Sequence, residues 1–145
     1  MAAQLHIKDN LKYWRVTELK ELFFYTLYMF HAYWDMGTIS HYAAKRIANT
    51  TRQNIAGYKI VLRSNDLKHF LYRHYAEKNS KQRGVKIQDI EQLPKVINNL
   101  SFVELQEDNT LYIETQFPNN ELFVTAVRID HDKKLLIGKS FRIKT

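Results

Sequence analysis

Two histidines and an arginine lie close together in one basic, aromatic segment of this chain. His69, Arg73 and His74 occur in the run LKHFLYRHYAEKNSKQRGV, which begins at Leu67. Histidine has the free pKa nearest neutrality, so a pair of histidines beside an arginine suits proton transfer next to an anion. On a helix the two histidines would lie about 140° apart, so they cannot both occupy the centre of one face. A solvated helix with one structural histidine explains the same pattern.

A second pair of polar residues occurs near the C-terminus, in a segment that alternates like a strand. Ser140 and Arg142 share one parity, so they should point together to the open face of a sheet. There they can hydrogen-bond a phosphate or form ordinary polar surface. The parity predicts two sets: Leu135, Ile137, Phe141 and Ile143 toward the core, and Leu136, Gly138, Ser140, Arg142 and Lys144 toward the open face.

Hydrophobic periodicity predicts which elements position these residues. Apolar spacing favours helices over 17–36, 38–50, 66–78 and 88–98 and a short strand over 58–62. From residue 101 the period changes to two, which predicts strands over 102–106, 111–117, 122–129 and 135–143. Short turns between successive strands imply an antiparallel meander. We therefore expect an α+β fold with N-terminal helices packed on a C-terminal four-stranded antiparallel sheet.

Composition and charge narrow the function classes. The chain has 145 residues, a net charge of +7 and no cysteine, which excludes disulfides and thiolate chemistry. A basic domain attracts polyanions such as RNA, DNA or an acidic protein. The sequence contains no run of 18 apolar residues, so a membrane-spanning helix is not expected. The N-terminus lacks the apolar core of a signal peptide. The sequence contains no His-x-x-x-His or Glu-x-x-His pair, so a catalytic metal is not expected. It contains no glycine-rich phosphate-binding motif, so nucleotide hydrolysis is not expected either.

Several short motifs follow one another in a recognisable order. They are Ala56-Gly57-Tyr58-Lys59, Leu67-Lys68-His69, Arg73-His74, Arg83-Gly84, Ile87-Gln88-Asp89-Ile90, Leu93-Pro94 and Val96-Ile97-Asn98-Asn99, and the strand meander comes last. This order resembles the phage and polymorphic-toxin members of the barnase–EndoU–colicin–RelE-like nuclease superfamily. The resemblance implies a nuclease-like domain over 38–145, preceded by an aromatic-rich helical extension over 1–37.

The resemblance also implies an activity. Such domains are metal-independent ribonucleases, often toxins that cut transfer RNA or messenger RNA by attack of the ribose 2′-hydroxyl on the adjacent phosphate. That chemistry needs a general base, a general acid and cations on the phosphorane oxygens. By position, the resemblance assigns catalysis to His69, Arg73, His74 and Ser140. The basic residues expected to bind RNA are Lys68, Arg83, Lys86, Lys139 and Arg142.

The same reasoning extends to partners and location. We expect RNA as the substrate, an acidic immunity or antitoxin protein as a second partner, and neither a cofactor nor a membrane. The lack of cysteine fits a reducing compartment. We therefore expect action in the cytoplasm, either where the protein is made or after delivery into a target cell.

Two other functions stay open at this point. Residues 38–48 followed by Thr50-Thr51-Arg52-Gln53-Asn54-Ile55 loosely resemble a helix-turn-helix, in which Arg52, Gln53 and Asn54 could contact base edges. The aromatic segment 17–36 could instead be a protein-binding face, since Tyr, Trp and Met are enriched at interfaces. The latter would suit a protein-binding phage inhibitor without catalysis.

Overall fold

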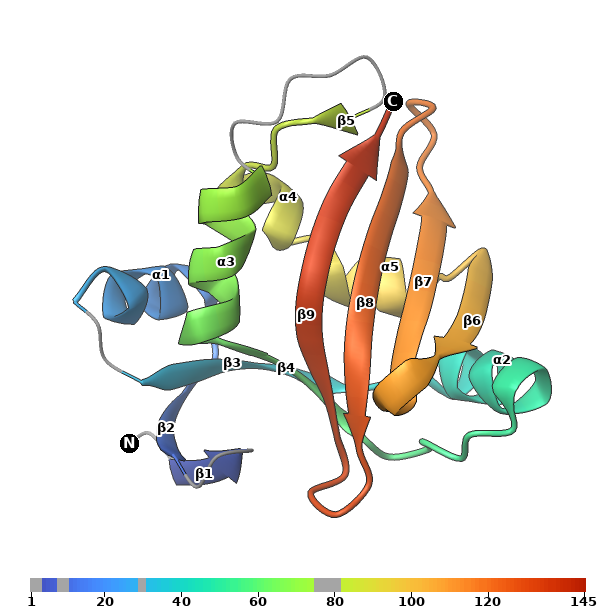
Figure 1. Cartoon of the computed structure of the whole chain (residues 1–145), viewed down its shortest axis with the longest axis horizontal. Helices are drawn as coiled ribbons and strands as arrows, with labels where there is room; N and C mark the ends of the chain where they lie inside the picture. Colours follow the sequence, from blue (N-terminus) through green and yellow to red (C-terminus); the bar gives the residue numbers. More distant parts are fainter. Residues whose placement is uncertain (1–3, 8–10, 29–30, 75–81) are drawn as a thin grey trace.

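The chain forms an α+β fold around one mixed sheet, shown in Figure 1. The computed structural model describes residues 4–7, 11–28, 31–74 and 82–145. The order of the strands in the sheet is β1-β2-β3-β4-β9-β8-β7-β6, and β5 pairs with β9. The predicted class is right, but the predicted four-stranded antiparallel sheet is wrong. The sheet continues beyond the meander into strands of the N-terminal half.

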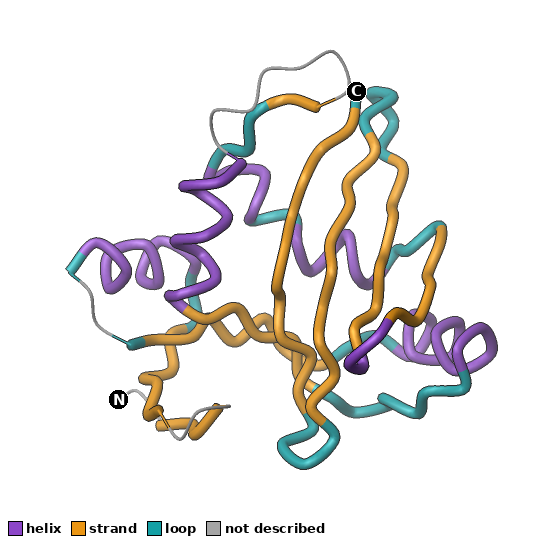
Figure 2. Tube along the Cα trace, in the orientation of Figure 1, coloured by secondary structure: helices purple, strands orange, loops and turns teal. Residues whose placement is uncertain are grey.

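The elements have the following bounds. The strands are β1 (Gln4–Ile7), β2 (Leu11–Val16), β3 (Ala32–Thr38), β4 (Lys59–Arg63), β5 (Gln82–Arg83), β6 (Phe102–Gln106), β7 (Thr110–Gln116), β8 (Leu122–Asp130) and β9 (Leu135–Lys144). The helices are α1 (Leu19–Leu27), α2 (His41–Thr51), α3 (Ser64–His74), α4 (Ile87–Ile90) and α5 (Leu93–Asn98), with a 3₁₀ turn over Glu107–Asn109. Figure 2 shows how helices and strands alternate along the first half of the chain.

The C-terminal meander agrees with the sequence prediction. Strands β6, β7, β8 and β9 pair antiparallel in that order. On its other side, β9 pairs in parallel with β4 through Ile60↔Leu136 and Val61↔Ile137. These partners are far apart in the sequence, and local periodicity carries no information about such a pairing. The meander was therefore predictable and its place in a larger sheet was not.

The long N-terminal helix predicted over 17–36 is wrong. The helix ends at Leu27, and Ala32–Thr38 forms β3, which pairs in parallel with β2 and antiparallel with β4. Tyr33 and Trp34 belong to different buried clusters, which is the alternation of a strand. The segment contains so many aromatic residues that some of them match helical spacing by chance, so the match did not show that the segment is a helix.

The other helices follow the predictions more closely. Helix α2 begins where Ser40 accepts a hydrogen bond from the backbone N–H of Ala43 at 3.1 Å. Helix α3 starts at Ser64 and is described as far as His74, whereas residues 75–78 of the predicted helix lie outside the described part of the chain. The helix predicted over 88–98 is two short helices, with Pro94 in the first turn of α5.

No second helix follows α2 where a helix-turn-helix would need one. Arg52 has a left-handed backbone conformation with φ of 64°, and residues 52–58 form a loop into β4. The side-chain carbonyl oxygen of Gln53 accepts a hydrogen bond from His131 Nε2 at 3.0 Å. The buried face of α2 packs on β6 and α5. The helix-turn-helix interpretation is therefore wrong.

A bulge at Lys139 in β9 reverses which residues face the helices. Ala126 of β8 lies opposite Ser140, while Val127 lies opposite Gly138, so Lys139 is the extra residue. Before the bulge Leu136 belongs to the large helix-side cluster, and after it Phe141 does. Leu135 and Ile137 belong to a smaller cluster on the opposite face. Leu135 and Ile137 are buried as predicted, although in this second cluster, whereas the open-face prediction is wrong for Leu136 and Gly138, which are buried. The predicted parity is right for Ser140, Phe141, Arg142 and Ile143.

Helix α3 is held against β9 by aromatic packing. Phe70 stacks on Phe141 with ring centroids 6.1 Å apart, and Phe141 meets Phe123 edge-on at 5.7 Å. Each such pair contributes about 0.5–1.5 kcal/mol beyond its buried area. In Figure 1, α5 lies behind β7 and β8, and the other face of the meander is uncovered. That uncovered face, which carries Tyr112, Arg128, Ser140 and Arg142, is called the open face below.

The N-terminal segment is joined to the same sheet by a buried carboxylate. The side chain of Asp35 in β3 is 4% exposed and accepts hydrogen bonds from Arg15 of β2 at 2.8 Å and from Lys59 of β4 at 3.2 Å. Burial alone would raise the pKa of Asp35. The bonds from Arg15, the Gly37 N–H and Lys59 outweigh burial, so this pKa lies below its usual value. The segment predicted as a helical extension therefore contributes strands as well as α1.

One face of α1 is apolar and exposed. Phe24, Leu27 and Tyr28 are 55%, 63% and 61% exposed. Leu19 and Leu22 are buried against the rest of the protein. No helix in the described ranges is long and apolar enough to cross a membrane.

We expect Gly138→Val to destabilise the fold, because Gly138 faces the helix side. A Cβ there would lie 3.3 Å from Leu62 Cδ1 and 3.6 Å from Leu93 Cδ2, so two further methyl groups overpack the core by about 1–3 kcal/mol. Ala126→Val on the open face is the matched control and should change stability by less than about 0.5 kcal/mol. Urea unfolding of both variants measures the difference. Equal stability of the two would contradict the reversed parity before the bulge.

Candidate active site

A charged cluster occupies the junction of β4, α3 and β9. The two carboxylate oxygens of Asp66 accept separate hydrogen bonds, from Arg63 Nε at 2.8 Å and from Lys139 Nζ at 3.1 Å. Arg63 and Asp66 are each only 6% exposed. β4 pairs with β9 as far as Ile137, so Arg63 at the end of β4 leads directly into α3 beside the bulged part of β9.

Lys139 has an unusual electrostatic environment. Burial lowers its pKa below the ordinary lysine value, and the charges of Arg63 and Arg128 lower it further. The nearby Asp66 carboxylate opposes these effects without cancelling them. A lysine with a lowered pKa can take part in proton transfer as well as bind an anion.

Ser140 and Arg142 lie on the open face, as predicted. Across the sheet, Ser140 pairs with Ala126 and Arg142 pairs with Val124. The hydroxyl of Thr125, on the helix side, donates to the carbonyl oxygen of Ser140 at 2.6 Å and fixes the backbone there. The side chains of Ser140 and Arg142 are both half-buried.

An aromatic–carboxylate pair lies beside Arg142 on the open face. The Tyr112 hydroxyl donates to Glu114 Oε2 at 2.5 Å. Burial and Glu114 both raise the pKa of Tyr112, while Arg142 lowers it through its charge and a hydrogen bond. Tyr112 therefore stays protonated near neutral pH and remains a hydrogen-bond donor.

His69 lies one turn after Asp66 on α3 and is half-buried. At 100° per residue, positions 66 and 69 lie within about 60° of each other around the helix. His69 is thus on the side of α3 that bears the Asp66 cluster. The side chains of Arg73 and His74 lie outside what the structure describes. Their catalytic assignment, like that of His69 and Ser140, stays a prediction.

The expected RNA contacts are spread over three places. Lys139 and Arg142 lie together on β9. Lys68 is exposed on α3, about 200° around the helix from Asp66, and Lys86 is exposed just before α4. Arg83 lies on β5 opposite Ile143, but its side chain is not described. Of the five expected RNA contacts, Lys139 and Arg142 are the two whose described side chains share the neighbourhood of Ser140.

Sequence reasoning missed other members of this site. They are Arg63, Asp66, Tyr112, Glu114 and Arg128. Arg128 lies between Val127 and Ile129, two helix-side core residues, so the alternation of apolar and polar residues along the strand could have placed it on the open face. The bond from Lys139 to Asp66 had no local signal, because the two residues are 73 positions apart.

A family model supplies the identity of the fold. The description "phage-Barnase-EndoU-ColicinE5/D-RelE like nuclease3" matches residues 37–145. The chain belongs to this nuclease family. The matched range includes every candidate catalytic residue and leaves out β1, β2, α1 and most of β3. Searches among curated proteins and among solved structures found no match.

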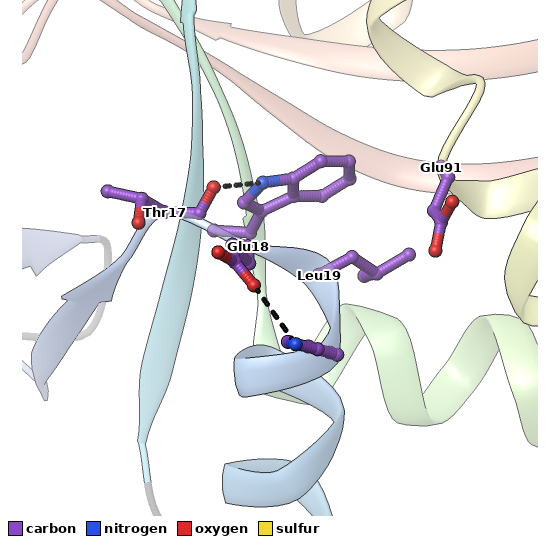
Figure 3. A pocket seen from close by; sticks show the side chains of 6 residues that line it. Thr17, Glu18, Leu19 and Glu91 are labelled. Carbon is purple, nitrogen blue, oxygen red and sulfur yellow. Dashed lines mark hydrogen bonds and ion pairs between the residues drawn. The ribbon is translucent and has the colours of Figure 1, made fainter.

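A separate pocket of about 390 Å³ lies at the start of α1. Leu19, Trp34 and Glu91 are among the residues that line it, and Figure 3 shows Leu19 and Glu91 at this site. The indole N–H of Trp34 donates to the carbonyl oxygen of Thr17 at 3.3 Å. None of the candidate catalytic residues lines this pocket. Among the described residues, no group of three or more His, Asp or Glu side chains could hold a metal ion.

We expect Asp66→Asn to destabilise the protein strongly. The change leaves the buried Arg63 guanidinium without its carboxylate, a loss that costs about 3–5 kcal/mol in comparable buried pairs. Asp108→Asn, at an exposed turn, is the control and should be nearly neutral. Urea unfolding at neutral pH is the measurement. A loss below about 1 kcal/mol would show that Asp66 does not anchor the cluster.

Proposed function

We propose that this protein is an endoribonuclease that cleaves RNA by transesterification on its open face, without a catalytic metal. One observation carries the proposal. In a chain of this nuclease family, Arg128, Lys139 and Arg142 surround Ser140 on the open face, while His69 lies on the adjoining helix. These side chains comprise the phosphate-binding and proton-transfer groups that RNA cleavage needs.

The proposed reaction is an in-line displacement. The 2′-oxygen bonds to phosphorus and the bond from phosphorus to the 5′-oxygen breaks, which leaves a 2′,3′-cyclic phosphate and a 5′-hydroxyl. A base takes the proton of the 2′-hydroxyl and an acid supplies one to the 5′-oxygen. His69 performs one of these transfers, and His74 or Lys139 performs the other. Arg142, with Arg73 by position, stabilises the charge on the phosphorane, and Ser140 orients it.

The biological setting forms part of the same proposal. The protein acts as a toxin in the cytoplasm, with transfer RNA or messenger RNA as target, and an acidic cognate protein inhibits it. The net charge of +7 favours both an RNA substrate and an acidic inhibitor. The alternative function, a protein-binding phage inhibitor, draws its support from the exposed face of α1, which lies outside the family match.

The chemistry is tested by His69→Ala. Removing a group that transfers a proton should slow RNA cleavage by about two to four decades and leave RNA affinity almost unchanged. His41→Ala, an exposed histidine of α2, is the control and should keep full activity. Mass spectrometry of the products should show a 2′,3′-cyclic phosphate, and cleavage should persist in EDTA. Full activity of the double variant His69→Ala, His74→Ala, or cleavage of a 2′-deoxy substrate at the same rate, would contradict the mechanism.

RNA binding should weaken with salt in proportion to the phosphate contacts. Each contact to a single strand contributes about −0.7 to the slope of log affinity against log salt concentration. Arg128→Ala should therefore make that slope shallower by about this amount, while the exposed Lys45→Ala on α2 should not. Fluorescence anisotropy at several salt concentrations gives both slopes. An unchanged slope in Arg128→Ala would exclude Arg128 from the RNA-binding surface.

A further inference from the structure

An aromatic pair lies on the open face at the far end of the meander from α3. Phe102 of β6 and Tyr112 of β7 have ring centroids 6.2 Å apart and planes at 75°. Val103 and Leu111, their neighbours in the chain, are buried in the helix-side core, so both rings project to the open face. Phe102 is 45% exposed. The two rings make a corner in which a flat group can stack on one ring and touch the edge of the other.

Around this corner, the charged residues of the open face differ from strand to strand. Arg142, Val124, Glu114 and Phe102 form one continuous row across β9, β8, β7 and β6. The cations stand on β8 and β9, whereas Glu104, which pairs with Tyr112, and Glu114 stand beside the aromatic corner. Carboxylates repel a phosphate but accept hydrogen bonds from the N–H groups of a nucleobase. The aromatic end of the row is therefore suited to a base, and the basic end to a phosphate.

The two ends of the row are close enough to bind one stretch of nucleic acid. Arg142 reaches the neighbourhood of Tyr112, since it lowers the pKa of that phenol. Strands in a sheet are spaced about 4.8 Å apart, so β6 lies only about 14 Å from β9. A base on the corner and a phosphate on Arg142 thus lie within one short segment of a strand.

We infer that the Phe102–Tyr112 corner binds an unpaired base of single-stranded RNA whose backbone lies on Arg128 and Arg142. This inference rests on the proposed ribonuclease function and names the form of its substrate. In a duplex both faces of a base are already stacked on other bases, and only an unpaired base offers a face to an aromatic side chain. The enzyme therefore acts on loops and unpaired regions of RNA.

The experiment compares two short probes that resist cleavage. One is a 2′-O-methyl oligouridine, and the other is the same sugar–phosphate chain without bases. Phe102→Ala should weaken binding of the base-containing probe about tenfold, since stacking on an aromatic side chain supports binding of that order. It should leave the abasic probe almost unaffected. Phe102→Trp keeps a stacking surface and should restore the affinity, and Phe24→Ala on α1 is the matched control with another exposed phenylalanine.

The outcomes separate this inference from the proposed function. If Arg128→Ala weakens binding of both probes while Phe102→Ala changes neither, the aromatic corner is not a base site and the RNA-binding surface stands. If Phe102→Ala weakens both probes equally, its effect is structural and the inference fails. If the unaltered protein binds neither probe at low salt, the inference and the proposed function fail together.

Discussion

The bulge at Lys139 is the constraint on which the arrangement of the site depends. It changes which residues of β9 face the helices, so that Leu135 and Ile137 pack with β3 and β4 on the opposite side while Phe141 packs under α3. The extra residue is itself the lysine that reaches Asp66. One irregularity therefore connects the two halves of the sheet and places a cation where the strand turns its polar residues outward.

The ion pairs around Asp66 have a structural role before any chemical one. Arg63 ends β4 and Asp66 lies in the first turn of α3, and both side chains are buried. A buried charge is tolerated only where partners compensate it, so the strand end, the helix start and Lys139 must be positioned together. The same contacts hold the side of α3 that bears His69 against the bulged half of β9. The same ion pairs therefore set the electrostatics of the site and hold the helix in place.

Different strands of the open face carry different kinds of side chain. β8 and β9 bear cations, while β6 and β7 bear an aromatic pair and two carboxylates. A uniformly basic surface would attract any polyanion. Separation of charge along a row of paired residues favours a ligand that is anionic at one end and a hydrogen-bond donor at the other, and a nucleotide has this form.

The sequence alone predicted the α+β class, helices α2 and α3, the four-strand meander, the family, and the shared face of Ser140 and Arg142. The family followed from a resemblance in the order of short motifs. The other features depend on spacing along the chain, which local backbone geometry sets. Only the tertiary structure revealed that Ala32–Thr38 is a strand, that β4 joins β9, and that Asp66 binds Lys139. These features depend on contacts between distant segments. A parallel pairing or a buried ion pair leaves no periodic trace in either segment, because its energy arises only when the two meet.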